Sequence, residues 1–275
     1  MPEAPPPQRG DVRIEASGGG SGNQGSDGSG GPSRRALVAG AGALAGLAGA
    51  VWRRRLALAE GSATGGKGIA VPIDKPPLDE REYSALTLPN GLRVLLVSDP
   101  DADRAAAALD VHVGFFSDPE DLPGLAHFCE HMLFLGTEQF PEESGFDAFL
   151  TASSGYSNAF TDNEDTCFYF TCLPASLEAG LERFGSFFKT PLFTASATER
   201  EVNAINSEFL KNLQDDSFRL NQILSSRSNP RHPFQHFGAG TRETLLEAPA
   251  KRGVDTREAL LKHYETFYRA PLMTL

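Results

Sequence analysis

The chain has 275 residues and a formal net charge of −11, with 40% apolar residues, 28 glycines and 19 prolines. Residues 1–68 carry 8 Lys/Arg against 5 Asp/Glu, while the remainder carries 17 against 31. The part with enough apolar residues to fold is therefore strongly acidic, which argues against nucleic acid as the main partner. Three cysteines are too few for a disulfide framework, so we expect free thiols.

Residues 1–68 read as a low-complexity leader. They contain the stretches "GGGSGNQGSDGSGGPS" and "GSATGGKG", whose few apolar residues cannot offset the entropy of ordering the chain. We therefore expect a disordered leader over residues 1–68 and a folded domain over residues 75–275.

A segment within the leader, residues 33–61, has features of a targeting or anchor sequence. Arg34 and Arg35 precede a weakly apolar run of Ala, Gly and Leu, so residues 34–50 resemble a twin-arginine signal that targets an organelle. Residues 36–52 are alternatively a single membrane anchor, near the lower length limit for a spanning helix. A leader with no such role is the third interpretation.

The folded domain opens with strand patterns. Residues 83–100 predict two short strands around an Asn-Gly pair, which is a strong hairpin signal. Residues 104–119 predict a third strand, because apolar residues alternate there.

The pattern then changes from strand to helix and back. Residues 121–136 predict a helix of about three turns that stops at Gly136, and residues 141–155 predict a second helix. Residues 156–173 predict two strands joined by the polar turn Asp162–Asp165.

Helices dominate the remainder. Residues 174–191 predict an amphipathic helix, residues 196–226 a long helical stretch with a bend near Asp215, and residues 253–269 a final helix. Because hairpins alternate with helices, we predict an α+β fold with a mixed, largely antiparallel sheet covered by helices.

The stretch "LAHFCEHMLFLGTE" places two histidines and a glutamate on the first predicted helix. His127 and His131 lie one turn apart and aim two imidazoles at one point, which Glu130 borders. Imidazole and carboxylate ligands suit a catalytic zinc that keeps one position open for water. A carboxylate beside that water can accept its proton, as in the H-x-x-E-H arrangement.

A third ligand has to come from another part of the chain. The stretch "EREVNAINSEFLKN" places Glu201 and Glu208 two helical turns apart, on one face. Taken alone, this pair is better explained by a solvated acidic face than by a metal site, so spacing selects neither residue as a ligand.

Four segments then resemble the insulysin branch of the pitrilysin family of zinc metallopeptidases, the inverzincins, in the order found there. The resemblance runs from about residue 75 to the end and rests on "GLAHFCEHMLFLGTE", "SGYSNAFTDNEDTCFYF", "REVNAINSEFLKN" and "NPRHPFQHFGAGT". It implies that His127, His131 and Glu208 bind one zinc ion. It further implies that Glu130 is the general base and that Glu201 orients a ligand histidine.

The resemblance also implies where a peptide substrate lies. In this family the peptide adds itself as an extra strand along the segment that "SNAFT" resembles. Asn158 and Ala159 match positions beside the scissile bond, and Phe134 matches an aromatic residue near the zinc pocket. Plain core packing explains Phe134 equally well. Cys129 fits best as a small buried hydrophobic residue.

Family members are far longer than this chain, so the resemblance implies an N-terminal catalytic domain that lacks a second half. Three hypotheses follow: a zinc metalloendopeptidase, a subunit of a split or processing peptidase, and a non-catalytic zinc-binding partner or anchor module. The partners implied are peptides and either a C-terminal half or a homologous subunit. The family favours a cytoplasmic location, and residues 34–50 and 36–52 supply the alternatives of an organelle or a membrane.

Overall fold

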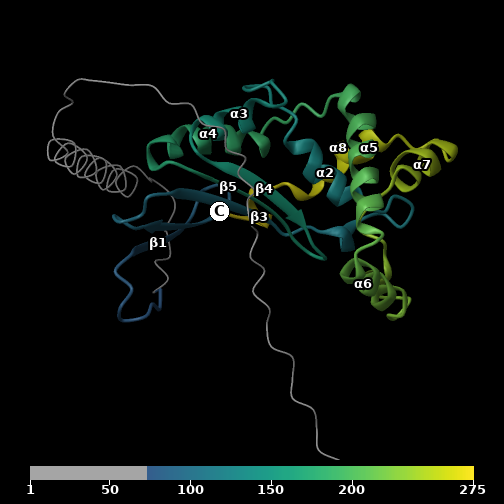
Figure 1. Cartoon of the computed structure of the whole chain (residues 1–275), viewed down its shortest axis with the longest axis horizontal. Helices are drawn as coiled ribbons and strands as arrows, with labels where there is room; N and C mark the ends of the chain where they lie inside the picture. The colour runs from purple at the N-terminus through teal and green to yellow at the C-terminus, as the bar shows by residue number, and fades with distance from the viewer. Residues whose placement is uncertain (1–72) are drawn as a thin grey trace, which may run out of the picture. The chain divides into compact units, whose positions relative to one another are not determined.

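The computed structural model describes residues 73–275 (Figure 1). The leader and its segments at 33–61 lie outside these residues, so targeting, anchoring and location stay predictions. Within the described part of the chain, no helix has both the length and the apolar character that crossing a bilayer requires.

Six strands form one sheet with the order β1-β2-β6-β3-β5-β4. The strands are β1 (Glu82–Thr87), β2 (Arg93–Ser98), β3 (Ala105–Val111), β4 (Tyr156–Thr161), β5 (Thr166–Cys172) and β6 (Met273–Thr274). All neighbouring pairs are antiparallel except β2 and β6, which are parallel. The prediction of a mixed, largely antiparallel sheet is therefore confirmed.

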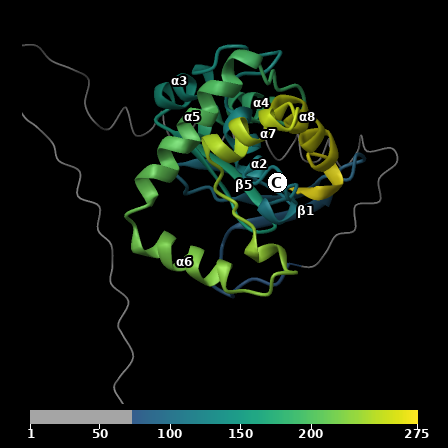
Figure 2. The same ribbon diagram turned by 90° about the vertical axis from the view of Figure 1, so that its right-hand side faces the viewer.

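The helices lie mainly over one side of this sheet, and α6 extends away from the end of α5 (Figures 1 and 2). They are α2 (Leu125–Leu133), α3 (Gly145–Ala152), α4 (Leu177–Phe187), α5 (Ala195–Asn212), α6 (Asp216–Ser226), α7 (Ala248–Lys251) and α8 (Thr256–Phe267). A π-helix, Glu243–Glu247, leads directly into α7. The α+β class with helices covering the sheet is confirmed.

The core forms between the sheet and these helices. On β5, alternate residues are fully buried, namely Phe168, Phe170 and Cys172, as expected for a strand with one face turned to the core. Phe184 from α4 contacts Phe170, with ring centroids 5.2 Å apart. The three cysteines are free thiols, as predicted.

The long helical stretch is divided where a bend was expected. Asp215 ends the connection between α5 and α6, and its side chain accepts hydrogen bonds from the backbone N–H groups of Ser217 at 2.8 Å and Phe218 at 3.3 Å. This is the N-cap arrangement that starts a new helix. The sequence pattern did not predict the π-helix or the two-residue strand β6.

Candidate active site

Helix α2 presents its histidines because its opposite face is fixed in the core. Leu125, Phe128 and Met132 are buried, and their spacing lines one side of a helix. His127 and His131 lie on the other side, where each is partly exposed. Burial of the apolar face therefore turns both imidazoles toward helix α5.

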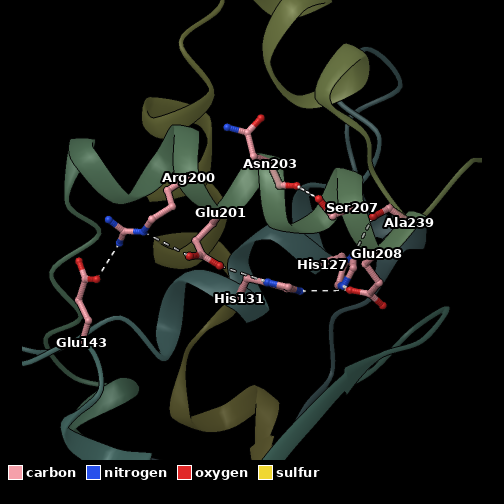
Figure 3. A network of polar contacts seen from close by, with 9 residues as sticks. All are labelled: His127, His131, Glu143, Arg200, Glu201, Asn203, Ser207, Glu208 and Ala239. Atoms are coloured by element: carbon pink, nitrogen blue, oxygen red, sulfur yellow. Dashed lines mark hydrogen bonds and ion pairs between the residues drawn. The ribbon is translucent and has the colours of Figure 1, made fainter. Parts of the chain in front are cut away.

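The two imidazoles and Glu208 converge on one point (Figure 3). The His127 and His131 rings lie 4.8 Å apart at an interplanar angle of 83°. Their Nε2 atoms lie 3.7 Å and 3.6 Å from Oε2 of Glu208, and the three candidate ligand atoms all lie within 4.8 Å of one another. Two imidazole nitrogens and one carboxylate oxygen at this spacing fit a tetrahedral zinc site with one open position.

Helix α5 supplies Glu208 and also the carboxylate predicted to orient a histidine. Glu201 Oε2 lies 3.4 Å from His131 Nδ1, on the side of the ring away from Glu208. Arg200 links Glu201 to Glu143, with Nε 3.8 Å from Glu201 Oε1 and Nη2 2.8 Å from Glu143 Oε2 (Figure 3). Glu201 and Glu208, whose roles could not be distinguished by sequence spacing, thus lie on opposite sides of the His131 imidazole.

These contacts shift the protonation of the metal-free site. Burial lowers the pKa of His131, but its contacts with Glu201 and Glu208 outweigh burial and raise the pKa to about 9. The contact with His131 lowers the pKa of Glu208, whose side chain is 44% exposed. A metal binds neutral imidazole and ionised carboxylate, so metal binding releases the His131 proton.

Glu130 interacts electrostatically with His127, His131 and Glu208 but has a different environment. It is 8% exposed, and its Oε2 accepts a hydrogen bond of 2.5 Å from the Thr161 hydroxyl on β4. Burial raises the pKa of Glu130, and the Thr161 hydrogen bond opposes this shift. A buried carboxylate with a raised pKa is suited to accepting and returning a proton near neutral pH.

Cys129, the residue before Glu130, is fully buried, and burial raises the pKa of its thiol. It is therefore a core residue and not a nucleophile.

The three residues predicted to contact substrate differ in exposure and in their contacts with the core. Among the residues that the structure describes, strand β4 pairs only with β5, and so it forms an edge of the sheet. Asn158 is exposed on that strand, and Ala159 is half-buried and packs against the core. Phe134 packs on Phe168 and Phe187, with ring centroids 6.1 Å and 5.4 Å away. Substrate roles for these three residues stay predictions, and Phe134 has core contacts that explain it.

Two groups at this site were not predicted from the sequence. Thr161 lies two residues after Ala159 in a strand, so strand alternation could have placed both on one face. The backbone oxygen of Ala239, which lies 2.6 Å from His127 Nδ1, leaves no signal in the sequence because every residue has a carbonyl.

Comparisons with known proteins identify the family of this chain. The family model described as "Insulinase (Peptidase family M16)" matches residues 93–231, half of the chain. The chain therefore belongs to this family of peptidases. The similarity to the pitrilysin family, inferred from sequence motifs, is confirmed.

Mouse insulin-degrading enzyme is 50% identical over 203 residues, which cover 74% of this chain and 20% of the relative. Insulin-degrading enzyme-like 1, peroxisomal, of Arabidopsis thaliana is 45% identical over 205 residues, covering 74% and 21%. The crystal structure of pitrilysin matches with a TM-score of 0.72 and 36% identity, covering 76% of this chain and 22% of that one. The chain thus spans about one fifth of the length of these relatives.

Proposed function

We propose that the described domain is the catalytic domain of a zinc-dependent metalloendopeptidase, with one zinc per chain. The observation that carries this proposal is the convergence of His127 Nε2, His131 Nε2 and a Glu208 oxygen within 4.8 Å, beside the buried carboxylate of Glu130. When bound there, zinc supplies Lewis-acid chemistry that activates a water molecule and polarises a peptide carbonyl.

The side chains of this domain supply the proton chemistry. Glu130 accepts a proton from the attacking water and returns it to the leaving amine. The Thr161 hydroxyl holds the Glu130 carboxylate in place through its hydrogen bond of 2.5 Å. Glu201 keeps the Nδ1 proton of His131 in place at 3.4 Å, which directs the lone pair of Nε2 toward the metal position.

The edge strand β4 provides a surface on which a peptide can be oriented. An extended peptide that pairs with this edge gains backbone hydrogen bonds, and Thr161 on the same strand contacts Glu130 directly. We propose that Asn158 and Ala159 lie beside the scissile bond. Phe134 is a weaker candidate because its ring packs on core residues.

A non-catalytic module and a subunit of a split or processing peptidase are the other hypotheses. The position of Glu130 beside the three donor atoms favours catalysis over a non-catalytic zinc-binding or anchor module. We also propose that a C-terminal half or a homologous subunit cooperates with this domain, since the relatives are about five times longer than the stretch they share with it.

The experiment measures hydrolysis of a quenched fluorescent peptide library by the chain with zinc, alone and with a C-terminal half from an insulysin-type relative. We expect zinc-dependent cleavage within peptides that Glu130→Gln abolishes. If neither preparation cleaves any peptide although zinc is bound, the peptidase proposal is wrong and the non-catalytic hypothesis gains support.

A further inference from the structure

The two histidines at the site differ in what fixes them. His131 Nδ1 faces the side chain of Glu201, whereas His127 Nδ1 lies 2.6 Å from the backbone oxygen of Ala239 (Figure 3). A carbonyl oxygen only accepts hydrogen bonds, so the proton of a neutral His127 resides on Nδ1. Nε2, 3.7 Å from Glu208, then presents its lone pair.

The Ala239 carbonyl is placed there by a close contact between two glycines. Gly240 has a φ of +80° and Gly124, the residue before α2, has a φ of +96°. A Cβ atom on Gly124 would lie 2.3 Å from Cα and 2.7 Å from N of Gly240, far inside van der Waals contact. Only glycine at position 124 therefore allows the two backbones to approach this closely.

Arg242, two residues after Gly240, is hydrogen-bonded to the other helix of the site. The backbone N–H of Arg242 donates to Asn206 Oδ1 at 3.1 Å, and its guanidinium donates to Asn203 Oδ1 at 2.6 Å. Both asparagines belong to α5, which carries Glu208. Residues 239–242 thus contact both helices that supply the candidate ligands.

We propose that residues 239–242 form a positioning segment, which fixes the tautomer and orientation of His127 through a backbone oxygen and depends on glycine at positions 124 and 240. This inference rests on the proposed zinc site. Among the described residues, no side chain forms a hydrogen bond with Nδ1 of His127. The orientation of His127 therefore depends on Gly124 and Gly240, which bring the Ala239 carbonyl into place.

The most direct test uses the unmodified, metal-free chain. Nitrogen-15 NMR of the imidazoles, at a pH where they are neutral and with His127→Gln to assign the signals, reports which nitrogen carries the proton. We expect the Nδ1–H tautomer for His127. An Nε2–H tautomer, or an equal mixture, would overturn the proposal whether or not the chain binds zinc or cleaves peptides.

A pair of glycine variants tests the origin of this arrangement. Gly124→Ala forces the two backbones apart, so we expect zinc affinity in chelator competition to fall about 10- to 100-fold and the His127 signal to become a tautomer mixture. Gly253→Ala is the matched control, because Gly253 has a similar φ of +74° but nothing within 4 Å of its Cβ position. It should keep both properties of the parent.

The outcomes separate this inference from the proposed function. A folded Gly124→Ala chain with the zinc affinity and His127 tautomer of the control would contradict a positioning role. Failure of the parent to bind zinc would contradict the proposed function, while its tautomer would still decide the inference. If Gly124→Ala does not fold, the spectrum of the unmodified chain gives the decision.

Discussion

The hydroxyl of Thr161 donates a hydrogen bond of 2.5 Å to the carboxylate of Glu130, and so connects the edge strand β4 to the helix that carries the histidines. The Thr161 side chain therefore links the proposed peptide-binding strand directly to the proposed general base. Small displacements of a peptide along β4 would change its position relative to Glu130.

Thr161→Val removes this donor while keeping the shape of the side chain. A hydrogen bond to a charged group contributes roughly 1.5–3 kcal/mol, so we expect kcat/KM to fall about tenfold or more. Because the hydroxyl lowers the pKa of Glu130, the acidic limb of the rate profile should move to higher pH. Thr161→Ser keeps a hydroxyl and should recover most of the activity; equal losses in both variants would argue against the hydrogen bond.

Glu130→Gln tests the general base. The amide has nearly the size of the carboxylate but cannot accept the proton, so we expect peptide hydrolysis to fall by about a hundredfold or more. Zinc content should stay that of the parent, because Glu130 is not among the three candidate ligands. The assay needs a preparation with measurable parent activity, and activity within a few-fold of the parent would rule out this role.

We expect the buried His263, which lies outside the candidate zinc site, to make the stability of the chain depend on pH. It is 5% exposed, and its Nε2 has no hydrogen-bond partner among the described residues. Burial lowers its pKa to about 4 from the ordinary 6.5. Between these values the unfolded chain binds a proton that the folded chain does not. The contribution of His263 to the free energy of unfolding should therefore be constant above pH 6.5 and fall by on the order of 3 kcal/mol toward pH 4.

Urea unfolding of the parent and His263→Leu, at about pH 7 and about pH 4.5, measures this contribution. The variant should lose less stability on acidification than the parent. The same loss in both chains would show that His263 is not its source.

Removal of residues 1–68 should leave the fold intact. All buried apolar residues of the described chain lie between Val94 and Met273, and the composition of the leader cannot offset its ordering entropy. We expect the shortened chain to show the same cooperative thermal transition, within a few degrees, and the same zinc content. Loss of the cooperative transition would show that the proposed boundary is wrong.

Much of the fold could be predicted because its signals are local. The Asn-Gly hairpin, the alternating strands and the apolar spacing of α2 each reflect a few consecutive residues, and the structure contains them at the expected places. Strand β6 was missed because two residues cannot show alternation, although its pairing with β2 makes the sheet mixed.

The candidate site also has parts that local sequence predicts and parts that it does not. His127, Glu130 and His131 follow from helical spacing alone, because one helix carries all three. The separate positions of Glu201 and Glu208 could not be derived from spacing, since both lie on one face of α5. The contact with the Ala239 carbonyl could not be predicted, because Ala239 lies 112 positions after His127 and contributes a backbone atom, not a side chain.

The central claim is that His127, His131 and Glu208 together bind one zinc ion. Its most direct test is the zinc content of the purified chain after dialysis, measured by atomic absorption for the parent, Glu208→Gln and Glu265→Gln. Glu265→Gln makes the same charge change at an exposed position on α8. We predict about one zinc in the parent and the control and a strong loss in Glu208→Gln, because the amide is a poor zinc ligand. Unchanged zinc in Glu208→Gln, or none in the parent, would contradict the assignment.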